Sequence, residues 1–171
     1  MTSNEHRKKA PKDLHVGVIT VSDTRAAAWE EERDEDESGK IIQRELEKAG
    51  YSSNRTIIPD EEDQIEEKLE ELISDSEIDA IITTGGTGIA SRDKTVEVVR
   101  TFLDKELPGV GEALRRLGYE RVGGPALLTR ATAGVANQKP LFCFPGAPNS
   151  VEVGMDLILP DLAHVVKHAR E

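Results

Sequence analysis

The chain has 171 residues and a mass of 18.7 kDa, a length that fits one compact domain. Its 22 Lys and Arg against 33 Asp and Glu give a net charge of −11, which argues against non-specific binding to nucleic acid or to an anionic membrane. The single cysteine, Cys143, excludes an intramolecular disulfide and a cysteine-based zinc site. No apolar run approaches the ~20 residues of a membrane span, and the polar first residues lack a signal peptide, so we expect a cytoplasmic protein.

Strand and helix patterns alternate from the start of the chain. Residues 14–21 are apolar and β-rich enough for a strand that is covered on both faces. Residues 30–37 contain seven acids in eight positions, which predicts a solvated, mobile loop. Ser38 is the expected cap of the next helix, which ends at Gly50, and residues 55–58 form a short strand.

The second half continues the alternation. Apolar residues at helical spacing predict two amphipathic helices, one carrying Ile65 and Leu69 and one that is capped by Thr95. A further helix is expected to end at Gly118, and residues 123–139 have no clear pattern. The remaining predictions are strands over residues 78–83 and 140–144, and a last helix over residues 151–165 that bends at Pro160.

Alternating strands and helices with short junctions predict an α/β fold, a three-layer αβα sandwich with a mainly parallel sheet. We expect a flexible N-terminal arm over residues 1–12 and a single domain over residues 13–171. Ligands in such folds bind at the carboxyl ends of the strands, so the residues that follow each strand are the candidates for chemistry.

A glycine-rich loop, residues 85–88, follows the middle strand. Glycines allow positive φ angles and let backbone N–H groups converge on an anion, and a helix that starts just beyond adds its positive end. The loop lacks the Lys-Ser/Thr pair of a Walker loop. The two interpretations are therefore a phosphate cradle and an ordinary tight turn.

Two aspartates, Asp60 and Asp93, follow neighbouring predicted strands. Two carboxylates beside an anion-binding loop suggest Mg²⁺ held by one or two acids together with substrate phosphates. Taken singly, Asp60 after Pro59 is better explained as a helix cap or turn residue, and the alternative for Asp93 is a surface turn. The residues alone therefore predict a phosphate-binding α/β domain that is assisted by a metal ion.

Read together, these segments resemble the MoaB/Mog family of molybdenum cofactor biosynthesis, which includes the gephyrin G domain. The resemblance runs from Leu14 to the last helix. Its motifs are residues 21–25 (VSDTR), 36–39 (DESG), 58–60 (IPD), 83–88 (TTGGTG), 92–95 (RDKT), 107–112 (LPGVGE) and 144–149 (FPGAPN).

The resemblance implies an enzyme that transfers an adenylyl group from ATP to the terminal phosphate of molybdopterin and releases pyrophosphate, in the presence of Mg²⁺ and without a tightly bound cofactor. It implies Asp60 and Asp93 as the catalytic and metal-binding pair. It also implies a phosphate- and nucleotide-binding set made of Ser22, Gly85, Gly86, Thr87, Gly88, Pro145, Gly146 and Asn149. The implied molybdopterin-binding set is Asp23, Arg25, Arg92, Thr129, Arg130 and Thr132.

Two departures from the family pattern leave an alternative open. Ile89 stands where many active relatives have proline, and Thr129 where many have serine. The alternative is a catalytically silent molybdopterin-binding or scaffold protein of the same pathway, although the intact Arg92-Asp93 pair favours an enzyme. The resemblance also implies a homotrimer or homohexamer and hand-over of the product to the metal-insertion protein.

Overall fold

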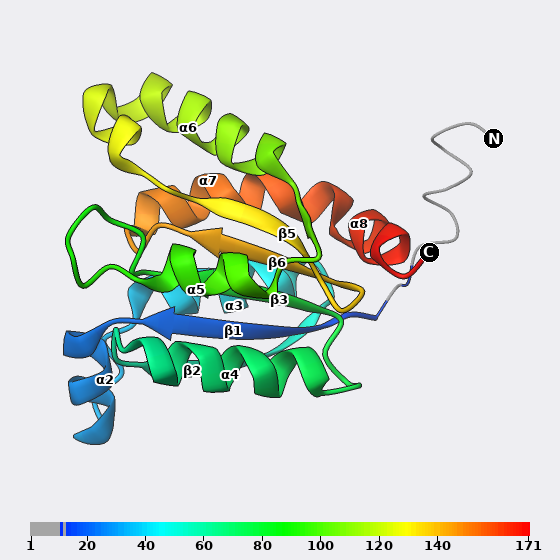
Figure 1. Cartoon of the computed structure of the whole chain (residues 1–171), viewed down its shortest axis with the longest axis horizontal. Helices are drawn as coiled ribbons and strands as arrows, with labels where there is room; N and C mark the ends of the chain where they lie inside the picture. Colours follow the sequence, from blue (N-terminus) through cyan, green and yellow to red (C-terminus); the bar gives the residue numbers. More distant parts are fainter. Residues whose placement is uncertain (1–10, 12) are drawn as a thin grey trace.

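The computed structural model describes Pro11 and residues 13–171, and the expected arm of residues 1–12 otherwise lies outside the described part. A six-stranded sheet in the order β2-β1-β3-β6-β5-β4 forms the middle of three layers, which confirms the predicted α/β sandwich (Figure 1). β2, β1, β3 and β6 pair in parallel, and β5 pairs antiparallel with both β6 and the short edge strand β4. The strands are β1 (His15–Val21), β2 (Ser52–Ile58), β3 (Ala80–Thr84), β4 (Lys105–Glu106), β5 (Thr132–Ala136) and β6 (Lys139–Phe144).

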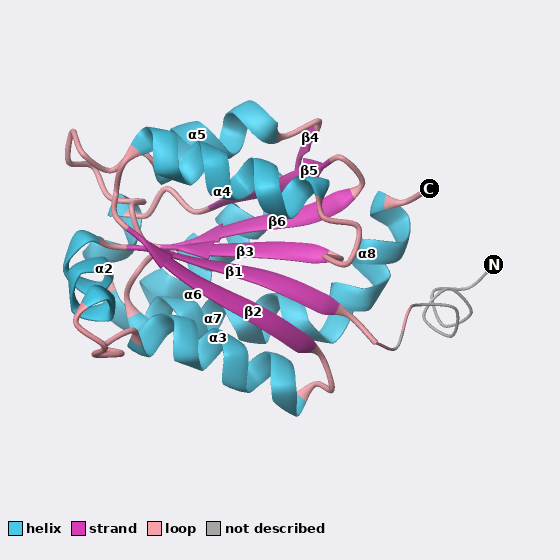
Figure 2. Ribbon diagram, turned by 90° about the horizontal axis from the view of Figure 1, so that it is seen from below, coloured by secondary structure: helices cyan, strands magenta, loops and turns pink. Residues whose placement is uncertain are grey.

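Helices cover both faces of the sheet (Figure 2). One face carries α3 (Glu37–Lys48), α6 (Pro108–Val122), α7 (Pro148–Ile158) and α8 (Leu162–Ala169). The other face carries α4 (Glu62–Ser74) and α5 (Thr95–Phe102). The short helix α2 (Asp23–Glu30) lies beyond the carboxyl end of β1, and two 3-10 turns, η1 (Gly124–Leu128) and η2 (Leu159–Asp161), complete the chain.

Each helix layer packs its apolar stripe on the side chains that alternate out of the central strands. Val16 and Val18 of β1 belong to the cluster under α3 and α7, whereas Ile19 belongs to the cluster under α4 and α5. The middle strands are thus buried on both faces, as their apolar runs predict. Cys143 of β6 is fully buried, and burial raises the pKa of its thiol to about 11, which confirms a structural thiol rather than a nucleophile.

Several helix boundaries differ from the predicted ones. Asp36, not Ser38, caps α3: its side chain accepts the Gly39 N–H at 2.9 Å, and Ser38 lies inside the helix. Lys94 rather than Thr95 occupies the cap position of α5, and no side chain caps that helix. Gly118 does not end α6, which continues to Val122, because a single interior glycine costs a helix only about 1 kcal/mol.

The irregularity predicted at Pro160 is present, but the expected single bent helix is divided in two, since η2 separates α7 from α8. The helix α2 was not predicted, because its Ala-rich sequence has no clear apolar stripe; the Ser22 side chain caps it by accepting the Arg25 N–H. Within the predicted solvated loop of residues 30–37, residues 31–35 do form a loop, which is exposed except at the half-buried Asp34. The prediction is wrong for Glu30 and Glu37, which belong to α2 and α3, and for Asp36, which has no exposed surface. In the described part of the chain no helix is both long and apolar enough to cross a bilayer.

Candidate functional site

A cavity of about 970 Å³ lies at the carboxyl ends of β1, β2, β3 and β6. The parallel strands bring these ends to one edge of the sheet, so segments that are far apart in the chain share one wall. The segments are the start of α2, the turn after β2, the glycine loop of residues 85–88 and residues 145–149 after β6, here called the strap. Residues of α6 and η1 also line the cavity.

The glycine loop can be built only with glycine at its first two positions. Gly85 has φ +98°, and a Cβ on it would overlap the carbonyl oxygen of Val21. Gly86 has φ +63°, and a Cβ there would overlap the Thr95 hydroxyl and lie 3.1 Å from Asp60 Oδ1. The backbone of the loop therefore packs directly between β1 and the start of α5, and it faces the cavity without side chains at these positions.

The carboxylate of Asp60 is held in the cavity wall with one oxygen unpaired. Its backbone N–H donates to Asp23 Oδ1 at 2.8 Å, and its own Oδ1 is buried with no hydrogen-bond partner. Burial raises the pKa of Asp60, the charge of Asp93 raises it further, and a hydrogen bond from the Lys94 backbone opposes both. Asp60 and Asp93 are therefore close enough to repel one another.

Asp93 is folded back onto its own loop. Its Oδ2 accepts the Ala90 N–H at 2.9 Å and lies 2.7 Å from the position of a Cβ on Gly88. A larger residue at Gly88 would push this carboxylate out of the cavity wall. The spacing between the glycine loop and Asp93 is thus a packing requirement as well as a sequence motif.

Positive charge in the cavity comes from arginines. Arg92 forms an ion pair with Asp23, so these two side chains link the loop before α5 to the start of α2. Arg25 is half-buried and forms no ion pair with any described residue, and Arg121 enters the wall from α6. Phosphate-bearing ligands need such groups locally in a chain whose net charge is −11.

Most of the predicted site residues share this one cavity. Those that line it are Ser22, Asp23, Arg25, Asp60, Gly85, Gly86, Thr87, Gly88, Arg92, Asp93, Thr129, Pro145, Gly146 and Asn149. Two of the predicted pterin-binding residues do not line it. Thr132 is buried in β5, where it pairs with Cys143 across the sheet.

Arg130 supports the glycine loop from outside the cavity. Its Nε donates to the carbonyl oxygen of Gly88 at 2.8 Å, its Nη2 donates to that of Asp93 at 3.0 Å, and it also pairs with Glu97. These bonds turn the loop carbonyls toward the guanidinium. Arg130 therefore supports the loop that carries Asp93.

Sequence reasoning missed the apolar wall of the cavity. This wall is made by Leu114, Gly118, Val122, Pro125, Ala126 and Leu128 of α6 and η1. The continuation of the α6 pattern past Gly118 was the available signal. An apolar surface of this kind can pack against the flat face of a ring system or against a second protein chain.

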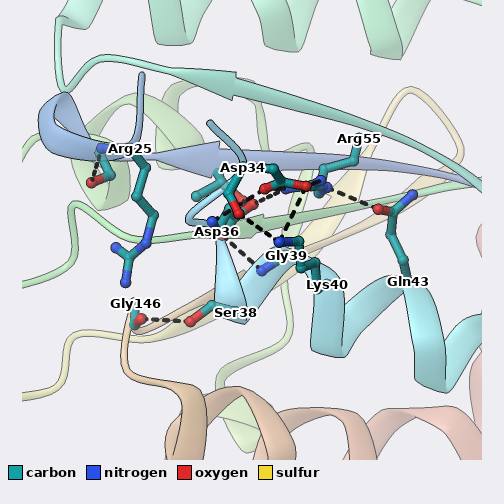
Figure 3. Close-up of polar contacts among 11 residues, drawn as sticks. Arg25, Asp34, Asp36, Ser38, Gly39, Lys40, Gln43, Arg55 and Gly146 are labelled. Carbon is teal, nitrogen blue, oxygen red and sulfur yellow. Dashed lines mark hydrogen bonds and ion pairs between the residues drawn. The ribbon is translucent and has the colours of Figure 1, made fainter. Parts of the chain in front are cut away.

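Sequence reasoning also missed a buried ionic network beside the cavity, drawn in Figure 3. Asp36 accepts three hydrogen bonds, from Thr20 Oγ1 at 2.7 Å, from Arg55 Nη1 at 2.7 Å and from the Gly39 N–H at 2.9 Å. Arg55 also donates to Asp34 at 2.6 Å, and its side chain is only 9% exposed. The network anchors residues 30–37, here called the acidic segment, to β1 and β2 through Asp34 and Asp36.

The cation at the centre of this network lowers the pKa of Asp34 to about 2, chiefly through the hydrogen bond from Arg55. Gln43 accepts the remaining Nε–H of Arg55 at 2.8 Å, and the Trp29 ring covers the guanidinium at 5.6 Å. Every donor of the network that faces inward is thus matched by an acceptor, which is the condition under which buried charge is tolerated.

A parallel α/β sheet with a glycine loop, paired carboxylates and arginines at its carboxyl edge defines a domain that binds phosphate-bearing ligands. Comparison with known proteins narrows this class. Residues 17–164 match the family model described as "Probable molybdopterin binding domain". The chain therefore belongs to the molybdopterin-binding domain family of the MoaB and Mog proteins, as its motifs indicated.

Two relatives and one solved structure illustrate the membership. The chain is 43% identical to the molybdopterin adenylyltransferase of Pyrococcus furiosus, with the whole of both chains covered. It is 42% identical to molybdenum cofactor biosynthesis protein B of Halalkalibacterium halodurans, covering 98% of this chain and 96% of the relative. The crystal structure of the tungsten cofactor synthesizing protein MoaB from Pyrococcus furiosus has a TM-score of 0.84 at 42% identity, covering 95% of this chain and all of that one.

Proposed function

We propose that this protein is a molybdopterin adenylyltransferase of molybdenum or tungsten cofactor biosynthesis. The relatives that span the whole chain carry this name or the name of the pathway. The observation that carries the proposal is the meeting of the glycine loop, Asp60, Asp93 and the strap around one cavity. In the reaction, an oxygen of the pterin's terminal phosphate bonds to the α-phosphorus of ATP, and the bond from that phosphorus to the pyrophosphate oxygen breaks.

The division of the cavity follows from the groups on its wall. Ser22 and the glycine loop of residues 85–88 would cradle phosphate with backbone N–H groups and hydroxyls, while Pro145, Gly146 and Asn149 of the strap would close the nucleotide side. The pterin would lie against the apolar wall of α6 and η1, with its polar edge toward Asp23, Arg25, Arg92 and Thr129. Arg130 and Thr132 would support this side from behind.

The residues fit a divalent cation. Asp60 Oδ1 is buried without a partner, and the pKa of Asp60 is raised in part by the charge of Asp93; a cation between the two carboxylates would relieve both costs. No group of three or more His, Cys, Asp or Glu suited to a metal occurs among the described residues, so the substrate phosphates would complete the ligand set, as is usual for Mg²⁺. Bound there, Mg²⁺ would offset the charge that phosphates accumulate during transfer.

The protein's own groups would act by positioning. Phosphoryl transfer requires alignment of the attacking oxygen with the leaving oxygen and little covalent help. The glycine loop would hold the phosphates of ATP, and Arg25, which has no carboxylate partner among the described residues, would bind the terminal phosphate of the pterin. The Asp23–Arg92 pair would fix the loop that carries Asp93.

The test is adenylyl transfer with purified protein, molybdopterin, ATP and Mg²⁺, scored by pyrophosphate and by adenylylated pterin. We expect pyrophosphate only when the pterin is present, and loss of product when the metal is chelated. Asp93→Asn is expected to abolish turnover while the pterin still binds, and Asp63→Asn on the exposed side of α4 serves as the control. Pterin binding without any product in the wild-type protein would instead favour a silent binding module.

We propose further that the protein works in the cytoplasm as a homotrimer or homohexamer and passes its product to the metal-insertion protein. The exposed apolar side chains on α6 and η1 support association, because contiguous patches of this kind mark interaction surfaces. The residues concerned are Leu117, Tyr119 and Leu127, which are exposed and do not line the cavity. Sedimentation analysis should give a mass of three or six chains, and Leu127→Glu should lower it.

A further inference from the structure

Two buried hydroxyl groups hold the strap by its carbonyl oxygens. Ser38 Oγ, near the start of α3, donates to the carbonyl oxygen of Gly146 at 2.8 Å (Figure 3). Thr84 Oγ1, at the end of β3, donates to the carbonyl oxygen of Pro145 at 2.9 Å. Ser38 is 1% exposed and Thr84 is fully buried, so neither hydroxyl can exchange its acceptor for water.

The direction of these carbonyls decides what the strap offers to a ligand. All described peptide bonds are trans, so the C=O and N–H of one peptide unit point in opposite directions. With the Pro145 and Gly146 carbonyls turned toward Thr84 and Ser38, the N–H groups of Gly146 and Ala147 point the other way. Neither N–H forms a hydrogen bond with another described residue, and both residues line the cavity.

We propose that Ser38 is a positioning residue for the nucleotide, because it keeps these two peptide units oriented with their N–H groups available to a phosphate of ATP. This inference rests on the proposed adenylyl transfer. Backbone N–H groups attract phosphate oxygens, whereas a carbonyl oxygen turned into the cavity would repel them. Without the Ser38 hydroxyl, the Gly146 carbonyl loses its buried donor, and the peptide is free to rotate toward water in the cavity.

The buried ionic network gives Ser38 its fixed place. Asp36 caps α3 through the Gly39 N–H, and Thr20 and Arg55 hold the Asp36 carboxylate against β1 and β2. Ser38 therefore sits on a helix end that is anchored on both sides, and its bond to Gly146 spans 108 residues of sequence. The acidic segment, through this chain of contacts, sets the conformation of the nucleotide side of the cavity.

Loss of the Ser38 hydroxyl is expected to affect the two substrates differently. The proposed division of the cavity assigns the strap to the nucleotide, so loss of the Ser38 hydroxyl should weaken ATP binding and leave pterin binding unchanged. One neutral hydrogen bond contributes on the order of a factor of ten in an equilibrium constant. We expect Ser38→Ala to raise the KM for ATP about tenfold, to change kcat less than twofold and to leave the KM for molybdopterin as in the wild type.

Matched variants distinguish positioning from general damage. Ser38→Thr keeps the hydroxyl and should restore most of the ATP affinity. Ser52→Ala removes another serine-to-carbonyl bond, from Ser52 to Leu14 at the opposite end of the sheet, and should behave as the wild type. Thr84→Val preserves shape while removing the second tie to the strap, and it gives the same readout if Ser38→Ala does not fold.

Binding of a non-hydrolysable ATP analogue, measured by calorimetry, provides a readout that is independent of turnover. Weaker analogue binding in Ser38→Ala and in Thr84→Val, with unchanged pterin binding, supports the inference. An active wild type with an unchanged KM for ATP in both variants overturns the inference alone. A wild type that binds the pterin but neither binds the analogue nor forms product overturns the proposed adenylyl transfer, and the inference with it.

Discussion

Removal of Arg55 should destabilise the protein far more than removal of an exposed arginine. In Arg55→Met the apolar stem is kept and the guanidinium is lost, which leaves the fully buried Asp36 carboxylate without its cation. Breaking a buried ion pair from one side costs about 3–5 kcal/mol. Asp36 retains the Thr20 hydroxyl and the Gly39 N–H as donors, so we expect the lower end, about 3 kcal/mol in the free energy of unfolding.

Urea denaturation at pH 7 measures this loss. The matched control is Arg44→Met on α3, whose side chain is 55% exposed and, among the described residues, forms an ion pair with its neighbour Glu45 alone; it should change the free energy of unfolding by less than about 0.5 kcal/mol. A double variant with Asp36→Asn should lose less than the sum of the two single changes, because no charge is then left buried. Equal effects of Arg55→Met and Arg44→Met would refute the assignment of a buried network.

The difference in the free energy of unfolding between the wild type and Arg55→Met should depend on pH. The folded pKa of Asp34, about 2, lies below its ordinary value because of Arg55. A lowered folded pKa adds stability above the ordinary pKa, and that stability is lost as the pH falls toward the folded pKa. The difference in stability between the wild type and Arg55→Met should therefore narrow between about pH 4 and pH 2; a difference that stays constant over this range would exclude Asp34 as a contributor.

Three further predictions concern the cavity and the core. Asp60→Asn should be at least as stable as the wild type at pH 7 in metal-free buffer but inactive, because it removes a buried charge repelled by Asp93; lower stability in urea would contradict this. Gly86→Ala should abolish nucleotide binding and destabilise the fold by at least about 2 kcal/mol more than the control Gly50→Ala. Both glycines have a positive φ, but a Cβ on Gly50 would meet nothing, whereas one on Gly86 would overlap Thr95. Similar urea midpoints for the two variants would argue against the tight loop. Cys143 should resist a thiol reagent at pH 8 until the protein is denatured, since burial raises its pKa to about 11, and rapid labelling of the native protein would disprove that burial.

The sequence by itself determined the architecture and the place of the site. The strands of residues 14–21 and 140–144 are apolar on both faces, and this pattern has no stable place except inside a parallel sheet that is covered by helices. Once the strands are parallel, the groups that follow them must meet at one edge. Asp60, Asp93 and the glycine loop could therefore be brought together from local patterns alone.

Tertiary structure alone decided which charges are buried. Residues 30–37 have the composition of a solvated loop. Asp36 can nevertheless be buried, because Thr20 of β1 and Arg55 of β2 donate hydrogen bonds to its carboxylate. The partners of Arg130 were also decided by the tertiary structure: the family resemblance implies a molybdopterin-binding residue, whereas its donors bond the carbonyl oxygens of Gly88 and Asp93.

The tie between Ser38 and the strap was equally beyond local reasoning. A serine near the start of a helix predicts a cap, because caps are formed by neighbouring residues. The acceptor that Ser38 uses instead lies 108 residues away, and it becomes the available partner only after the fold has brought the strap beside the start of α3. Local patterns record the preferences of each segment for strand, helix or turn, whereas the partner of a buried polar group depends on which distant segments the fold packs against it.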